Sequence, residues 1–240
     1  MATEHVLIIG GSSGMGLALA ERLLADGARV TIAGRSAHRL AAAATRLDRP
    51  DRLGTEQVDI GNEAQVRRLL AAAAPLDHIA VTAADATGAT APVADFDLDN
   101  ARAVLDTKLL GPWLVAKHAG AFLAPGASIT FTSGISAYRP GPGASITAAA
   151  NGALEALARA LALELAPIRV NVVSPGWTDS PLWDTIAADS RTERLNAMAA
   201  RLPTRRIGHP DDIAHAIQAL IRNTFITGTV LHIDGGQRLV

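Results

Sequence analysis

The 240-residue sequence contains no cysteine, few aromatic residues and no long apolar run. The lack of cysteine excludes disulfide bonds, thiolate metal sites and cysteine nucleophiles. No stretch reaches the roughly 18 apolar residues that a membrane-spanning helix needs, and no charged segment followed by an apolar one opens the chain. We therefore expect a cytoplasmic protein that does not bind membranes.

Charge is scarce as well. The formal net charge is −1 and charged residues make up 19% of the chain, so no basic field predicts a nucleic-acid partner. The seven histidines show no metal-ligand spacing, and we expect no metal site. His209, before Pro210, is expected in a turn ahead of a helix capped by Asp211. At this length we expect one domain over residues 1–240.

Short β-branched runs alternate with segments of helical periodicity along the chain. Strands are predicted over residues 5–9, 29–33, 56–60, 78–82, 128–132, 168–173 and 229–233. Helices are predicted over residues 15–26, 62–73, 99–123, 146–165 and 211–222. The alternation predicts an α/β fold with a doubly wound parallel sheet covered on both faces. The irregular stretch 177–207 is expected as an insertion over the carboxyl edge of the sheet, where such folds bind ligands.

A glycine-rich loop, "GGSSGMG", follows the first predicted strand and opens the first predicted helix. Glycine permits a tight turn and a close approach of the backbone to a pyrophosphate, whose charge then meets the amide groups of the helix N-terminus. The predicted phosphate-binding residues are Gly10, Ser12, Ser13, Gly14, Met15 and Gly16. The alternative is an ordinary strand-to-helix turn without a ligand.

The second predicted strand ends in "AGRSAHR", without the acidic residue that accepts hydrogen bonds from the ribose of NAD. Arg35, with Ser36 as a further donor, favours a 2′-phosphate and therefore NADP(H) over NAD(H). The alternative for Arg35 is a solvated loop arginine. Asp59 is expected near the adenine amino group with Ile60 beside it, and Asp59 is also a candidate N-cap for the next helix.

The chain resembles the short-chain dehydrogenase/reductase family over essentially its whole length. The resemblance rests on "IIGGSSGMGLALAERL", "VDI", "LALELAPIRVNVVSPG", "RRIGHPDDIA" and "FITGTVLHIDGG". It implies a single Rossmann-like domain with a seven-stranded sheet, a nicotinamide cofactor and usually a tetramer. It also places Ala83, Pro175, Gly176, Thr178 and Ser180 at the cofactor, with Ser180 in place of the threonine that holds the carboxamide.

The catalytic positions that the resemblance implies all differ from the family pattern of Asn, Ser and Tyr-x-x-x-Lys. The Asn position carries Lys108 and the Ser position carries Gly134, with Ser133 next to it as a possible hydroxyl donor. The Tyr and Lys positions carry Thr147 and Asn151. The family's usual proton-transfer pair is therefore missing from the helix predicted over 146–165.

The candidates for the missing chemistry are Lys108, Thr147, Ser133 and Tyr138. An aliphatic hydroxyl holds its proton far more tightly than a phenol, so Thr147 is expected to form hydrogen bonds rather than to act as an acid. Asn151 is expected to bind the ribose hydroxyls of the cofactor. We hypothesise that Lys108 supplies the missing cation and acts as acid, since burial lowers the pKa of an amine; the alternative is a surface or interface lysine. Tyr138, the sole tyrosine, is either a proton donor or a packing cap over the pocket.

The segment 146–165 is apolar almost all round, which predicts cover on both of its sides. We expect a homo-oligomer, a dimer or tetramer, formed through this helix and residues 99–123. The leading interpretation is an NADP(H)-dependent oxidoreductase acting on a small carbonyl, alcohol or imine-like substrate. The alternatives are an inactive NADP-binding regulator or structural subunit, and a non-redox enzyme with structural NADP.

Overall fold

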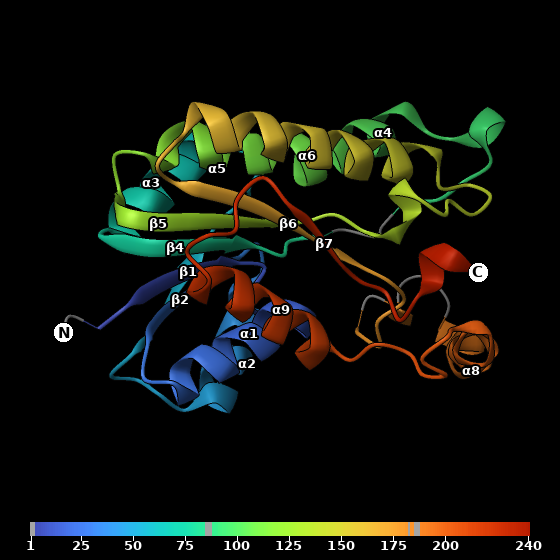
Figure 1. Ribbon diagram of the computed structural model, residues 1–240, viewed down its shortest axis with the longest axis horizontal. Helices are drawn as coiled ribbons and strands as arrows, with labels where there is room; N and C mark the ends of the chain where they lie inside the picture. Colours follow the sequence, from blue (N-terminus) through green and yellow to red (C-terminus); the bar gives the residue numbers. More distant parts are fainter. Residues whose placement is uncertain (1–2, 85–87, 182, 185–187) are drawn as a thin grey trace.

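Seven parallel strands form one sheet in the computed structural model, which describes residues 3–84, 88–181, 183–184 and 188–240. The strand order is β3-β2-β1-β4-β5-β6-β7 (Figure 1). The strands are β1 His5–Ile9, β2 Arg29–Gly34, β3 Leu53–Gln57, β4 Leu76–Val81, β5 Leu123–Thr132, β6 Arg169–Pro175 and β7 Val230–Ile233. This topology confirms the predicted doubly wound α/β fold, in which the chain moves outward from β1 and then crosses back to β4.

Helices cover both faces of the sheet (Figure 1). The α-helices are α1 Gly14–Ala25, α2 Ala37–Leu47, α3 Glu63–Ala73, α4 Leu98–Leu105, α5 Gly111–Ala119, α6 Ser145–Glu164, α8 Arg191–Arg201 and α9 Pro210–Arg222. Short 3₁₀ turns are η1 Val93–Asp95, η3 Ile135–Ala137, η4 Ala188–Ser190 and η5 Gln237–Leu239, and a π-helical turn, η2, spans Asp106–Leu110. Helices α3, α5 and α6 contribute to the core on one face, and α1, α2 and α9 to the core on the other.

The core follows from the alternation of side chains along the strands. In β1, Leu7 and Ile9 join one hydrophobic cluster while Val6 and Ile8 join the other, and all four are essentially inaccessible to solvent. A strand buried on both faces needs apolar residues at every position, which explains the continuous apolar run at 5–9. The rigid sheet then fixes the positions of the loops at its carboxyl edge.

The bounds of several predicted elements differ in the structure, and two of these differences bear on the site. The bounds predicted for the strand over 56–60 were wrong. Strand β3 ends at Gln57, because its pairing with β2 ends where Gly34 pairs with Gln57. Asp59 and Ile60 consequently lie in the connection beyond the strand. The predicted helix 99–123 is divided by the π-helical turn and ends at Ala119, because β5 begins at Leu123. A π turn inserts one residue into the helical register, which changes the direction of the side chains around it.

The segment 177–207 is more regular than its composition suggested, since it contains the 11-residue helix α8. Its first part is fixed to the main fold by backbone hydrogen bonds from Asp179 N to Gly208 O, at 2.8 Å, and from Gly208 N to Trp177 O, at 3.0 Å. Arg191 of α8 adds ion pairs to Asp179, at 2.6 Å, and to Asp184. None of the helices in the described part of the chain combines the length and apolarity needed to cross a membrane.

Candidate functional site

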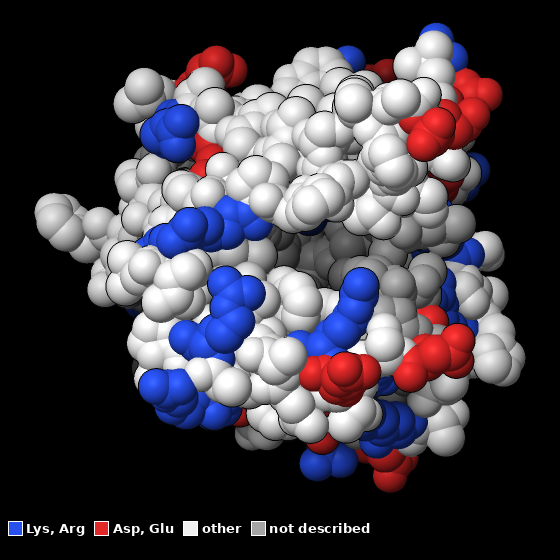
Figure 2. Space-filling view, turned by 90° about the vertical axis from the view of Figure 1, so that its right-hand side faces the viewer, with Lys and Arg blue, Asp and Glu red and all other residues white. Residues whose placement is uncertain are grey.

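A pocket of about 290 Å³ opens at the carboxyl edge, where β1 and β4 meet the first turn of α1. Figure 2 shows this edge hollowed near its centre, with Lys and Arg side chains on more than one side of the hollow. Of the predicted cofactor residues, those that line the pocket are Gly10, Ser12, Ser13, Gly14, Met15, Arg35, Asp59, Ile60, Ala83 and Ser180. The structure thus brings together residues that lie up to 170 positions apart in the sequence.

The glycine loop has the geometry that a phosphate cradle needs. Gly10 has a φ of +97° and Gly14 a φ of +51°, both in the left-handed region that disfavours other residues. Gly16 lies inside α1 rather than on the pocket wall, and a Cβ there would sit 2.4 Å from the carbonyl oxygen of Gly10. Gly16 is therefore needed for close packing of α1 on the loop. Ser13, the N-cap of α1, makes no capping bond with its side chain to any described residue, so the first amide groups of the helix remain available to an anion.

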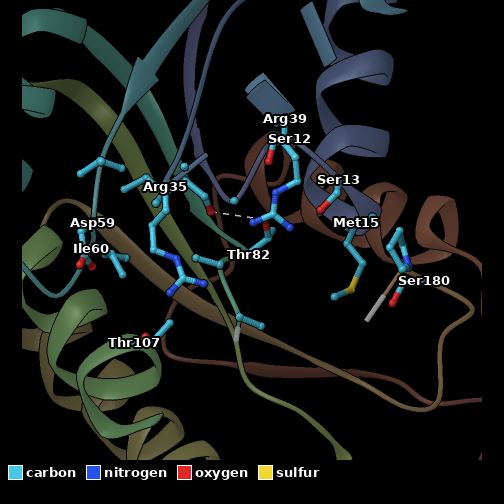
Figure 3. A pocket seen from close by; sticks show the side chains of 18 residues that line it. Ser12, Ser13, Met15, Arg35, Arg39, Asp59, Ile60, Thr82, Thr107 and Ser180 are labelled. Carbon is cyan, nitrogen blue, oxygen red and sulfur yellow. Dashed lines mark hydrogen bonds between the residues drawn. The ribbon is translucent and has the colours of Figure 1, made fainter. Parts of the chain in front are cut away.

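Arg35 and Arg39 border one end of the pocket together with Gly34 and Ser12 (Figure 3). In Figure 3 the guanidinium of Arg35 extends toward Thr107, away from that of Arg39. The prediction missed Arg39 and included Ser36, whose hydroxyl instead accepts the Arg39 amide at 3.3 Å as the N-cap of α2. The side chain of an arginine in the first turn of a helix can point back toward the loop before that helix. The position of Arg39, three residues after Ser36, could therefore have suggested it as a pocket residue.

Asp59 lies on the pocket wall, but the alternative that it caps α3 was wrong. The N-cap is Asn62, whose side chain accepts the Gln65 amide at 3.1 Å. The Asp59 carboxylate accepts the Gly61 amide at 3.0 Å and so stabilises the turn between β3 and α3. One of its oxygens therefore has a structural partner.

The loop after β6 contributes less to the pocket than expected. Ser180 and Pro181 line the pocket, whereas Pro175, Gly176 and Thr178 do not. Gly176 packs so closely on the C-terminal segment that a Cβ would lie 2.7 Å from the Asp234 Cα. The Thr178 hydroxyl is buried and donates to the Gly176 carbonyl oxygen at 3.1 Å. The first half of this loop therefore anchors the segment that carries Ser180.

Neither Thr147 nor Asn151 is among the residues that line this pocket. The Thr147 hydroxyl donates to the Ala89 carbonyl oxygen at 2.9 Å, which commits its proton to the backbone. Asn151 is 3% exposed, and its amide donates to Ser136 Oγ at 2.8 Å. Its Oδ1 is buried without a hydrogen-bond donor among the described residues. A Cβ with tetrahedral geometry on Gly134 would lie 3.2 Å from Asn151 Nδ2, so the glycine gives Asn151 its room.

Lys108 lies in the π-helical turn, next to Thr107 on the pocket wall. Its partly buried ammonium donates to the carbonyl oxygens of Thr132, at 3.0 Å, and Ser133, at 3.5 Å, at the carboxyl end of β5. Burial lowers its pKa to about 8, since an apolar environment disfavours the charged amine. No carboxylate of the described residues forms an ion pair with Lys108. The Lys108 ammonium therefore lies at the carboxyl edge of the sheet with only backbone carbonyl oxygens as its bonded partners among the described residues.

Tyr138 is not arranged as a proton donor to a substrate. Its hydroxyl donates to Glu155 Oε2 at 2.5 Å, while burial and the neighbouring carboxylate raise its pKa to about 12. Ser133 Oγ donates to the other oxygen of Glu155 at 2.7 Å. The prediction of Ser133 and Tyr138 as hydroxyl donors to a ligand is therefore not supported, because both hydroxyl protons are directed at Glu155.

Glu155 was missed by the prediction. It is 5% exposed and shares the buried face of α6 with Asn151 and Leu154. A charged residue one turn after Asn151 on a face otherwise occupied by apolar residues was the available sequence signal. Tyr138 also contacts His232 of β7 edge to face, with ring centroids 4.7 Å apart. Among the described residues, no group of three or more His, Asp and Glu side chains is arranged to hold a metal.

Comparisons with known proteins agree with this architecture. A family model described as enoyl-(acyl carrier protein) reductase matches residues 10–238. The chain is 36% identical to the short-chain dehydrogenase/reductase malC of Malbranchea aurantiaca, covering 98% of this chain and 95% of that protein. It is 32% identical to the cis-4-hydroxycyclohexanecarboxylate dehydrogenase of Sinomonas cyclohexanicum, covering 100% and 98%.

Solved structures give the same result. The MalC reductase/Diels-Alderase of Malbranchea aurantiaca superposes with a TM-score of 0.93 at 35% identity, covering 99% of this chain and 97% of that chain. A small-chain dehydrogenase in complex with NADPH superposes with a TM-score of 0.83 at 31% identity, covering all of both chains. The chain therefore belongs to the short-chain dehydrogenase/reductase family of oxidoreductases.

Proposed function

We propose that this protein is an NADP(H)-dependent oxidoreductase that acts on a small carbonyl, alcohol or imine-like substrate and uses Lys108 in place of the family's tyrosine and lysine. The observation that carries the proposal is a single pocket that combines a glycine loop, a helix N-terminus and two arginines. These groups are complementary to a dinucleotide that carries an additional phosphate.

The residues of the pocket fit NADP(H). A Cβ on Gly10 would lie 2.5 Å from the Ala83 amide nitrogen, and a Cβ on Gly16 would lie 2.4 Å from the Gly10 carbonyl oxygen. Both glycines are therefore needed for the compact loop whose amide groups would face a pyrophosphate. Arg35 and Arg39 would hold the 2′-phosphate, which an acidic residue at the end of β2 would repel. Solved relatives bound to NADPH, including an actinorhodin polyketide ketoreductase variant, support this preference.

We assign proton transfer to Lys108, whose ammonium lies at the carboxyl end of β5. A bound nicotinamide supplies or accepts the hydride. With a pKa of about 8, Lys108 is mostly protonated at pH 7, and a fraction is neutral. Its ammonium would donate to a developing alkoxide in reduction, and its neutral amine would accept the proton in oxidation. Thr147 and Tyr138 have their hydroxyl protons bonded to Ala89 and Glu155, so neither competes for this role.

Cofactor binding and turnover test the proposal in sequence. Calorimetry should show tighter binding of NADPH than of NADH, and a panel of aldehydes, ketones, quinones and imines should reveal cofactor oxidation. With the best substrate, Lys108→Met should lower kcat by about 100-fold or more, the usual range for loss of a general acid. The wild-type reduction rate should fall as pH rises above about 8, because the ammonium form of Lys108 is then lost.

Lys117→Met is the matched control, because Lys117 is the only other lysine of the chain and pairs with Glu63 outside the pocket. Its rate should equal that of the wild type. Wild-type turnover by Lys108→Met would remove Lys108 from the mechanism. Tight NADPH binding without turnover on any member of the panel would instead indicate a non-catalytic protein.

A further inference from the structure

A buried carboxylate at the carboxyl end of β5 has no role in the chemistry proposed above. Glu155 lies on the sheet-facing side of α6 and is 5% exposed. Burial of a carboxylate is unfavourable unless hydrogen bonds replace its hydration. Both of its oxygens have such a partner, Ser133 Oγ at 2.7 Å and Tyr138 OH at 2.5 Å. A leucine or alanine would fill this face of the helix without that cost, so packing alone does not explain the glutamate.

The two hydroxyls belong to the two ends of one short segment, residues 133–138, which leaves β5 and contains the turn η3. Glu155 of α6 therefore accepts a hydrogen bond from each end of this segment. One turn earlier on the same helix, Asn151 holds the middle of the segment through Ser136 Oγ at 2.8 Å. From the π-helical turn, Lys108 holds the start of the segment through the carbonyl oxygens of Thr132 and Ser133.

Ser133 is the residue that joins these contacts. Its side chain is bonded to Glu155, and its carbonyl oxygen accepts from the Lys108 ammonium. Fixing the side chain of a residue restricts the rotation of its own peptide group. Glu155 and Lys108 are thus connected through one residue, Ser133.

From this connection we infer that Glu155 is a positioning residue for Lys108: acting through Ser133, it orients the backbone carbonyl oxygens that hold the Lys108 ammonium in place. The inference rests on the proposed role of Lys108 and adds a residue that no sequence motif identified. It explains why a carboxylate is kept in a buried position without a bonded cation among the described residues.

Other charged and titratable groups lie around the cluster. Burial and Glu155 raise the pKa of the Tyr138 phenol, and Arg159 of α6 and Arg238 near the C-terminus oppose that rise. Burial and Arg238 lower the pKa of His232, and Glu155 and Asp234 oppose that fall. Around Lys108 itself, burial accounts for the lowered pKa. Carbonyl oxygens that accept from an ammonium favour its charged form, so loss of one of them should lower the pKa of Lys108 further.

The titration of Lys108 can be measured directly, because the chain has only two lysines. Protein labelled with ¹³C at the lysine Cε gives two NMR signals, and Lys117→Arg assigns them. We expect Glu155→Gln and Ser133→Ala each to lower the pKa of Lys108 by at least about half a unit, a threefold change in its ionisation constant. The double variant should shift it no further than either single variant, since both act through the same bond.

Glu164→Gln is the matched control, an exposed glutamate on the same helix, and it should leave both lysine signals unchanged. A merely structural role for Glu155 would lower the melting temperature without moving the Lys108 titration. An unchanged titration in folded Glu155→Gln would overturn the inference. If that variant does not fold, an unchanged titration in Ser133→Ala overturns it equally.

The measurement needs neither cofactor nor substrate, so it separates this inference from the proposed function. A shifted Lys108 titration together with wild-type turnover by Lys108→Met would refute the catalytic role and retain the positioning contact. An unchanged Lys108 titration in the Glu155 and Ser133 variants, together with the expected loss of turnover in Lys108→Met, would support the catalytic role of Lys108 and refute the positioning role of Glu155.

Discussion

At the scale of single residues, we predict that Arg39 contributes to the proposed preference of the pocket for NADPH over NADH. Arg39 lines the pocket together with Ser12 and Gly34, where the ribose phosphate is proposed to bind. A charge-assisted hydrogen bond to a phosphate contributes about 1.5–3 kcal/mol. Arg39→Ala should therefore raise the Kd for NADPH by about 10-fold or more and leave the Kd for NADH nearly unchanged, as measured by calorimetry.

Arg46→Ala provides the control for this prediction. Arg46 lies on the same helix, α2, but is 64% exposed and pairs with Glu21 at 3.5 Å. Its replacement should change neither dissociation constant. An equal loss of affinity for both coenzymes in Arg39→Ala would mean that Arg39 contacts a part that the two share, such as the pyrophosphate.

At the scale of elements, α9 has His209 as its N-cap rather than Asp211, which the sequence suggested, and Asp212 bonds this N-cap residue. Asp212 accepts the His209 amide at 2.7 Å and binds both terminal nitrogens of Arg206, at 2.6 and 2.8 Å. The Arg206 guanidinium is the main reason why the pKa of Asp212 falls to about 2. Asp211 instead pairs with Arg22 of α1, which ties α9 to α1.

The lowered pKa of Asp212 makes its contribution to the free energy of unfolding depend on pH. Because the pKa of Asp212 is lower in the folded than in the unfolded chain, its stabilisation is complete above about pH 4 and is lost as pH falls toward 2. Arg206 is 58% exposed, so solvent screening reduces the contribution to about 1 kcal/mol. Asp212→Asn should lower the free energy of unfolding by about that amount at pH 7, measured by denaturant titration, and the difference should vanish near pH 2. A difference that persists at pH 2 would contradict the assigned charge effect.

At the scale of the whole molecule, the layer formed by α5 and α6 predicts an oligomer. Within the described chain, the outward side of this layer exposes Leu110, Trp113 and Leu163, at 46%, 40% and 82%. Alanines at positions 149, 156 and 160 are also exposed and would let a second helix approach closely. Light scattering should show a dimer or tetramer, and Trp113→Glu should dissociate it, because a charge would be buried in an apolar contact.

Ala41→Glu is the corresponding control, since Ala41 lies on the exposed side of α2, on the opposite face of the sheet. It should leave the oligomeric state unchanged. A monomeric wild-type protein at micromolar concentration would remove the prediction, and the exposed apolar residues would then need another explanation.

The sequence alone was sufficient for features that depend on neighbouring residues. The apolar run at 5–9, the glycine loop and the helical period over 146–165 each reflect contacts within one element and its immediate connection, so they predicted β1, the pocket and α6. The prediction that Thr147 and Asn151 stand at the family's tyrosine and lysine positions also came from the sequence. These features are local because strand alternation, glycine φ angles and helical spacing are properties of short stretches of chain.

Tertiary structure alone decided which polar groups meet at the end of β5. Ser133 and Glu155 lie 22 positions apart, and Lys108 lies 24 positions before Thr132, so only the packing of α6 and the π-helical turn on the sheet joins them. From the sequence, the Tyr138 hydroxyl was a candidate proton donor to a substrate. In the structure it donates its hydrogen bond to Glu155. Hydrogen-bond partners and burial are set by elements that converge from distant parts of the chain, and they determine the acidity of each group.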